Sequence, residues 1–135
     1  MRRLPLMALV ATFGFACGEQ VEPGPVYTVY GTVTSVRFDV SRKLAAVKLV
    51  AEGGTIMDPP LYSGSCIVQG PQCQYTILFV AEGSYHAFAM IDRNNNLDDQ
   101  QLIPDSGDLV TGARPLMVWD KTQLDWPDSV WREQP

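Results

Sequence analysis

The segment 90–108, MIDRNNNLDDQQLIPDSGD, places acidic and amide side chains directly behind an apolar run, SYHAFAMI. Side chains at alternating positions of a tightly curved loop can point their oxygens at one centre, and calcium takes roughly six to eight oxygens at about 2.3–2.6 Å. Neutral amide oxygens also limit the repulsion among neighbouring acids. The segment therefore predicts a calcium site, and the oxygen-bearing side chains available to it include Asp92, Asn94, Asn96, Asp98, Asp105 and Asp108.

A solvated turn without an ion is the competing interpretation, since Asp and Asn favour turns through bonds to their own backbone. Two arguments favour the ion. A plain turn does not need so many carboxylates, and their mutual repulsion is costly without a cation. Magnesium fits this long loop less well than calcium does, because magnesium keeps several waters and uses few protein ligands.

Three tryptophans near the C-terminus, Trp119, Trp126 and Trp131, alternate with aspartates and form a second candidate site. As an exposed platform they could stack on sugar rings. The interpretation we favour is that they pin the C-terminal segment to the domain by burying large apolar area. His86, the one histidine of the chain, lies in a strand-like run, and no G-x-S-x-G motif accompanies it, so Ser-His-Asp hydrolysis is not indicated.

The N-terminus has the layout of a bacterial lipoprotein signal. Arg2 and Arg3 precede the apolar run LPLMALVATFGFA, which ends at Ala16 directly before Cys17. The run is shorter than the roughly 20 residues that span a bilayer. We predict a signal peptide over 1–16, lipidation of Cys17, and a tether over 17–25; ordinary cleavage near Ala16 is the alternative. This arrangement predicts a protein anchored by lipid in the bacterial cell envelope, at the outer membrane.

Two further cysteines, Cys66 and Cys73, flank the turn-forming Gly70-Pro71 in CIVQGPQC. An oxidising envelope permits a disulfide between them. Two free thiols are the alternative, and a metal pair is disfavoured because the spacing is not C-x-x-C and no histidine is near.

The charge of the chain excludes some partners. The formal net charge is −5, and loss of Arg2 and Arg3 with the signal peptide makes it −7. Nucleic-acid binders carry basic patches, so we expect no nucleic acid among the partners. An acidic domain of this kind fits a cation binder or a solvated module.

Strand-like runs recur between turn-rich segments: VYTVYGTVTSVRF (26–38), KLAAVKLVAEGG (43–54), QYTILFVAEGSYHAFAMID (74–92) and RPLMVW (114–119). We expect a bulge or bend near Thr34-Ser35, where the apolar phase changes, a hairpin at EGS, and a central strand at ILFV, which is apolar on both faces. On the second run we expect Lys48 on the polar face. No window sustains a helical period. The pattern predicts an all-β domain over 26–135, a single antiparallel two-sheet sandwich.

Three segments in this order, YGTVTSVRFDVSRKLAAVKLVAEGG, YTILFVAEGSYHAFAMIDRNNN and DSGDLV, resemble the carboxypeptidase-regulatory-like or transthyretin-like (prealbumin-like) sandwich domains of bacterial envelope proteins. The resemblance covers residues 26–112. It implies a calcium loop in which Asp92, Asn94 and Asn96 are the first ligands and Asp105 and Asp108 close the site. Leu97 stands where that family's loop has Gly, and DDQQLI is an insertion, so Asp98 and Asp99 have no counterpart.

These observations favour a noncatalytic, envelope-anchored sandwich that serves as a binding or structural module, with an envelope protein or a glycan as partner. The alternatives are a carbohydrate-binding module and a small hydrolase that uses paired carboxylates such as Asp98 and Asp105.

Overall fold

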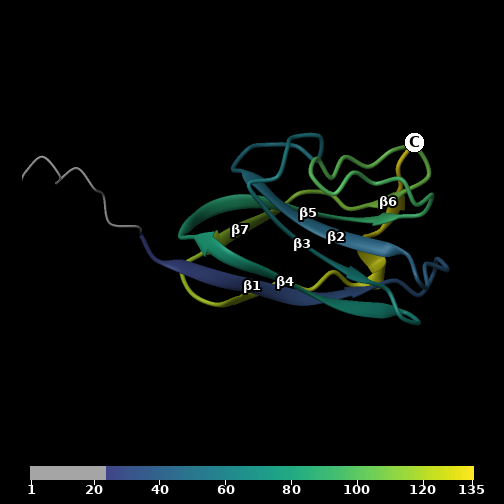
Figure 1. Cartoon of the computed structure of the whole chain (residues 1–135), viewed down its shortest axis with the longest axis horizontal. Helices are drawn as coiled ribbons and strands as arrows, with labels where there is room; N and C mark the ends of the chain where they lie inside the picture. The colour runs from purple at the N-terminus through teal and green to yellow at the C-terminus, as the bar shows by residue number, and fades with distance from the viewer. Residues whose placement is uncertain (1–23) are drawn as a thin grey trace, which may run out of the picture.

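Two packed β-sheets make up residues 24–135, the part of the chain that the computed structural model describes (Figure 1). The predicted signal peptide, the predicted lipidation site Cys17 and the predicted tether up to residue 23 lie outside the described residues. The elements are β1 (Val26–Thr34), β2 (Leu44–Ala51), β3 (Tyr62–Ile67), β4 (Gln72–Ala81), β5 (Gly83–Asp92), β6 (Leu109–Val110), β7 (Arg114–Val118), β8 (Thr122–Gln123), the 3₁₀ turn η2 (Asp128–Val130) and β9 (Arg132–Glu133). The predicted two-sheet β-sandwich is confirmed. Within residues 24–135, no helix is long and apolar enough to cross a membrane.

The smaller sheet has the strand order β4-β1-β8. β1 and β4 pair antiparallel from Val26↔Ala81 to Thr34↔Gln72. β8 pairs with β1 in the parallel direction. Gly31 makes this parallel approach possible, because a Cβ there would lie 1.9 Å from the carbonyl oxygen of Leu124.

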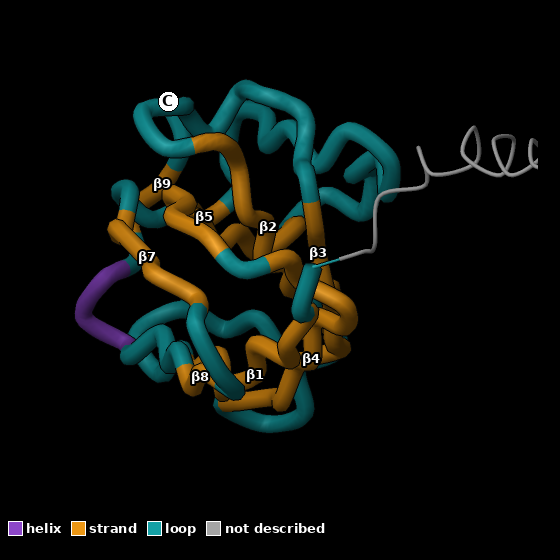
Figure 2. Tube along the Cα trace, turned by 90° about the vertical axis from the view of Figure 1, so that its left-hand side faces the viewer, coloured by secondary structure: helices purple, strands orange, loops and turns teal. Residues whose placement is uncertain are grey.

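The larger sheet has the order β3-β2-β5-β6-β9, and β7 also pairs with β5. β2 and β5 pair antiparallel along their whole length, from Leu44↔Asp92 to Ala51↔Tyr85. On its other side β5 pairs with β7 through its first half and with β6 near its end. Figure 2 shows the two sheets as separate layers, with the smaller sheet below.

The main core lies between the sheets and contains alternate residues of each strand, such as Val29 of β1 and Leu49 of β2. Trp126 is fully buried there and Trp131 is 3% exposed. Both indole N–H groups are satisfied, since Trp126 donates to the Tyr75 hydroxyl at 3.3 Å and Trp131 to the Thr34 carbonyl at 2.7 Å. These two tryptophans pin the C-terminal segment to β1.

A second, smaller core covers the outer face of the larger sheet. Ala46 and Met90 on that face pack with Leu102 from the loop after β5 and with Val110. Figure 2 shows loops over this face. β2 and β5 are therefore apolar on both sides, which is the pattern of a central strand.

The prediction of a central strand at ILFV is wrong. β4 is an edge strand of the smaller sheet, and Leu78 and Phe79 are exposed by 57% and 72%. Of the two alternatives near Thr34-Ser35, the structure has a bend and not a bulge: β1 ends at Thr34 and the chain bends at residues 36–38. The register shift lies instead between Tyr27 and Val29 of β1, opposite Leu78-Phe79.

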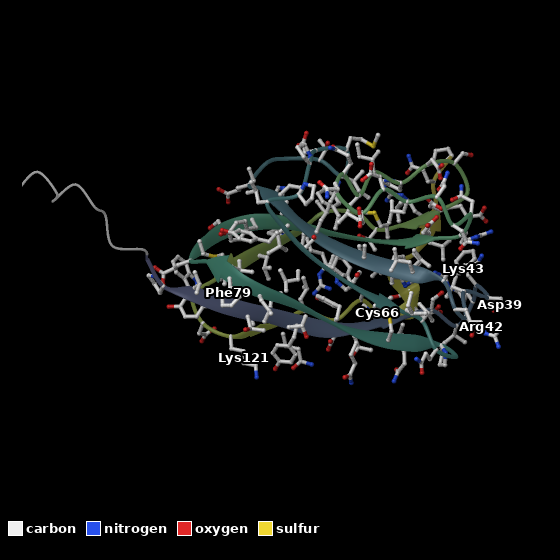
Figure 3. All side chains as sticks on the ribbon, viewed as in Figure 1. Asp39, Arg42, Lys43, Cys66, Phe79 and Lys121 are labelled. Carbon is white, nitrogen blue, oxygen red and sulfur yellow. A yellow bond between two sulfur atoms is a disulfide. The ribbon has the colours of Figure 1, made fainter. Side chains whose placement is uncertain are left out.

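The predicted disulfide between Cys66 and Cys73 is confirmed, with an S–S distance of 2.06 Å and a Cα–Cα distance of 5.9 Å. Cys66 is on β3 and Cys73 is on β4, so the bond joins the edge strand of one sheet to the edge strand of the other. Figure 3 shows Cys66 between the two layers. The disulfide thus fastens the open side of the sandwich.

Replacing both cysteines by alanine is expected to lower the free energy of unfolding by about 2–3 kcal/mol, because the unfolded chain loses a closed loop. Urea denaturation of the Cys66→Ala/Cys73→Ala variant measures this change. Reduced wild type should match the variant, and the variant should not respond to reductant. Equal stability of oxidised and reduced wild type would contradict the prediction.

Candidate metal-binding loop

The loop 93–107 leaves the larger sheet at the end of β5 and returns at the start of β6. The pairs Met90↔Val110 and Ile91↔Leu109 bring the two strands together. The same register, continued by one residue, sets Asp92 opposite Asp108. Two of the predicted ligands therefore stand at the root of the loop, and both are buried, with 4% and 1% exposure.

Asp92 closes the first turn of the loop. Its carboxylate accepts hydrogen bonds from the backbone N–H groups of Asn96, at 3.3 Å, and Leu97, at 2.9 Å. The turn needs one residue in the left-handed region, and Asn95 takes it with φ 62°. Leu97, which replaces the expected Gly, does not need to. Asparagine tolerates this conformation better than most residues with a Cβ, so this first turn of the loop needs no glycine.

Asp108 ties the two ends of the loop together. One carboxylate oxygen accepts from the Arg93 N–H and the other from the Asp105 N–H, each at 3.0 Å. Burial raises the pKa of Asp108, and the two backbone N–H groups partly oppose that rise. The carboxylate is therefore a staple between the two halves of the loop.

Asp105 meets the two predicted amide ligands from the opposite side of the loop. Nδ2 of Asn94 donates to Asp105 Oδ1 at 2.8 Å, and Nδ2 of Asn96 donates to Asp105 Oδ2 at 2.6 Å. These two bonds lower the pKa of the Asp105 carboxyl. The alternating pair read from the sequence does place its side chains on one side, facing a common acid.

Asp98 does not join this group. Its carboxylate accepts from the backbone N–H groups of Gln100 and Gln101, at 2.7 and 3.3 Å, and so caps its own turn. Asp98 and Asp99 are both exposed. The structure thus brings together five of the six predicted ligands, Asp92, Asn94, Asn96, Asp105 and Asp108, through hydrogen bonds to one another and to the loop backbone. The assignment of Asp98 as a ligand is not supported by its place in the loop.

The carboxylates of this loop accept hydrogen bonds from other parts of the loop and do not form a metal site by themselves. Among residues 24–135, no three His, Cys, Asp or Glu side chains are grouped closely enough to hold a metal ion by themselves. Any ion in the loop would therefore need the amide oxygens as well. Because each carboxylate oxygen has two lone pairs, the staple bonds leave acceptor capacity on each acid.

Lys48 supports the loop from beneath, and the sequence pattern did not reveal this role. The side chain is fully buried on the outer face of β2, not solvated as expected. Its ammonium donates to the carbonyls of Asp58 at 2.7 Å and Leu102 at 2.8 Å, which belong to the two segments that cover this face. The available signal was its position between Val47 and Leu49 in an otherwise apolar run.

The three tryptophans do not form one platform. Trp126 and Trp131 are in the core, so the alternative of a three-tryptophan platform is wrong; Trp119 is 53% exposed.

His86 has a structural role. It accepts a hydrogen bond from the Gly53 N–H at 3.2 Å and so holds the turn after β2. A depression of about 440 Å³ is lined by residues 35–41, 70 and 71, and the loop acids are not among them. A hydrolase that pairs Asp98 with Asp105 is not favoured, because the two amide bonds lower the pKa of Asp105, whereas a general acid needs a raised pKa.

Comparison with known proteins identifies no relative: no protein-family model, curated protein or solved structure matches the chain.

The burial of Lys48 predicts a pH dependence of stability. Burial lowers its pKa to about 8 from 10.5, and the attraction of Asp58 opposes that shift. Between these two values the unfolded chain holds more protons than the folded one, so the contribution of Lys48 to the free energy of unfolding rises with pH. We expect wild type to gain stability relative to Lys48→Met from pH 8 to pH 10.5.

Denaturation of both proteins across pH 7–10.5 measures this difference, and groups present in both cancel. Lys121→Met, which removes the same charge from an exposed position, is the matched control, and the change with pH should be larger for Lys48→Met than for this variant. A flat difference for Lys48→Met would mean that the ammonium titrates as it does in water.

Proposed function

We propose that this protein is a noncatalytic lipoprotein of the bacterial cell envelope, anchored through Cys17, whose transthyretin-like sandwich acts as a binding or structural module with a calcium-stabilised loop. The observation that carries the proposal is the meeting of Asn94 and Asn96 with Asp105. It assembles, across two halves of one loop, the mixed carboxylate and amide set that calcium prefers.

The chemistry of the donors fits a hard cation. Rotating the Asn94 and Asn96 amides about χ2 turns their Oδ1 atoms toward Asp105, so that oxygen replaces N–H on both sides. The ion would then be held by Asp92, Asn94, Asn96, Asp105 and Asp108. When bound, calcium offsets the charge of three acids, two of which are buried. It would stabilise the native loop without any change in the sheets.

The disulfide supports the proposed location. A bond between Cys66 and Cys73 persists in oxidising compartments and is rare in the cytosol. It agrees with the N-terminal signal read from the sequence, in which Cys17 is left for the lipid. A diacylated cysteine supplies two chains, which is what stable anchoring requires.

The arrangement of the carboxylates supports a noncatalytic role. Each carboxylate oxygen of Asp92 and Asp108 accepts a hydrogen bond from a backbone N–H group, which fixes both side chains in the loop. Asp105 has a lowered pKa, so at neutral pH it would be a poor proton donor. These acids organise a loop, as expected for a module that presents a surface to an envelope protein or a glycan.

Calcium is expected to raise the melting temperature of the domain. Binding stabilises the native state by about 2.7 kcal/mol at a hundredfold excess over Kd. Thermal melting with calcium and with a chelator measures the response, and magnesium at equal concentration should do less. Asp105→Ala should lose the response and melt no higher than the chelated wild type, because it also loses the bonds from Asn94 and Asn96.

The matched control is Asp99→Ala, which removes the same charge from an exposed position in the same loop. It should keep the full calcium response. If wild type melts identically with calcium and with chelator, the loop holds itself by hydrogen bonds alone, and the ion site is wrong.

Lipidation predicts that cells grown with labelled fatty acid will mark the wild-type protein. Cys17→Ser should abolish the label and move the protein from the membrane fraction to the soluble fraction. The Cys66→Ala/Cys73→Ala variant controls for cysteine loss and should keep the label. Label on Cys17→Ser would show that another residue carries the lipid.

A further inference from the structure

Phe79 has an unusual backbone for a bulky residue. Its φ is 60°, in the left-handed region that residues with a Cβ seldom occupy. It forms the bulge of β4 with Leu78, opposite β1. The aromatic side chain gains little burial from this arrangement, since it is 72% exposed. The strained backbone of Phe79 is not explained by packing in the core, so it points to another role for this residue.

Three other exposed apolar side chains lie at the same end of the sandwich. Val26 begins β1 and pairs with Ala81, just beyond the bulge of Leu78 and Phe79. Trp119 follows Val118, the last residue of β7, which pairs with Gly83 at the start of β5. We call Val26, Leu78, Phe79 and Trp119 the tether-end patch; their exposures are 49%, 57%, 72% and 53%.

The N-terminal part of the chain joins the domain at this end. The Glu82 N–H donates to the Pro25 carbonyl at 3.3 Å, which holds the start of the domain against the β4–β5 hairpin. Figure 3 shows Phe79 near the end of the sandwich at which β1 begins, and Asp39, Arg42 and Lys43 at the opposite end. Cys17 precedes Gly24 by seven positions, and covalent geometry limits that span to about 25 Å.

We propose that the tether-end patch rests on the lipid bilayer, with Phe79, Leu78 and Trp119 in contact with the acyl boundary. The proposal rests on the Cys17 anchor proposed above. An anchored chain of this length keeps the patch near the bilayer at high effective concentration, so even weak apolar contact is enough to hold it there. Aromatic side chains favour the interface between headgroups and acyl chains.

The charges around the patch indicate which lipid surface suits it. Glu82 and Asp120 lie beside it together with Lys121, whose ammonium stacks on Tyr30 at 4.9 Å from the ring centroid. This mixed set offers no basic cluster for anionic headgroups. The patch therefore fits a zwitterionic surface, where apolar contact is the main attraction.

The test uses the lipidated full chain in vesicles of phosphatidylcholine with brominated acyl chains, which quench tryptophan. Trp119 is exposed, while Trp126 and Trp131 are buried, so the Trp119→Phe variant supplies the background. We expect quenching of wild type beyond that background, and loss of that extra quenching in Phe79→Gly. Leu78→Asp is the second variant and should also lose the extra quenching. The control is Val36→Asp, which should keep the extra quenching, because Val36 is 68% exposed but follows the far end of β1.

Thermal melting separates contact from folding. Glycine adopts positive φ freely, so Phe79→Gly should melt at or above the temperature of wild type while losing lipid contact. A lower melting temperature together with unchanged quenching would assign Phe79 a packing role and overturn the proposal.

Co-flotation separates this proposal from the anchor. Protein that fails to float with vesicles overturns the Cys17 anchor, and this proposal with it. Protein that floats with Trp119 unquenched overturns the docking alone. Soluble Cys17→Ser protein that dimerises in sedimentation, and becomes monomeric with Phe79→Gly, would show that a second copy covers the patch instead of lipid.

Discussion

The antiparallel ladder between β2 and β5 is central to this domain because both of its faces are apolar. A sheet with one apolar face needs one partner layer, and this one needs two. The smaller sheet covers the inner face. The outer face has no sheet to cover it, so the segment after β2 and the loop after β5 must fold back over it. The candidate metal-binding loop is therefore also part of the cover of a core.

A loop that covers apolar surface must satisfy its own backbone. Asp92 and Asp108 do this, since each carboxylate accepts two backbone N–H groups. Asp105 instead accepts the side-chain amides of Asn94 and Asn96. Lys48 does the opposite, bringing a buried cation to two carbonyls that would otherwise lack donors. Polar side chains thus replace the hydrogen-bonded ladder that a third layer of strands would have provided.

The sequence predicted what alternation and turn chemistry encode. β2, the β4–β5 hairpin, β7 and the disulfide follow from apolar periodicity, Gly positions and cysteine spacing. The convergence of Asn94 and Asn96 follows from their alternation, because residues two apart share a side of a curved loop. Asp98 was misread because composition shows how many oxygens a loop has and not which of them cap local turns.

The remaining errors have one physical origin, which is long-range pairing. The four apolar residues ILFV are compatible with a central strand and equally with an edge strand that exposes an apolar patch. The choice depends on which strands pair with this one. β8 also depends on long-range pairing, because its two residues pair with Val29 and Tyr30 of β1. The burial of Lys48 likewise depends on the two other segments that supply its partners, Asp58 and Leu102. Such features depend on which segments meet, and no local pattern records that.

The course of β1 has a mechanical consequence. It starts where the N-terminal chain arrives and runs to the far end of the molecule, paired with β4 along its length (Figure 1). A pull on Gly24 away from the domain acts along the strand, and therefore shears many hydrogen bonds together instead of unzipping them one by one. The disulfide between Cys66 and Cys73 in turn links β4 covalently to β3. Load introduced at the N-terminus thus passes from one layer to the other through a covalent bond.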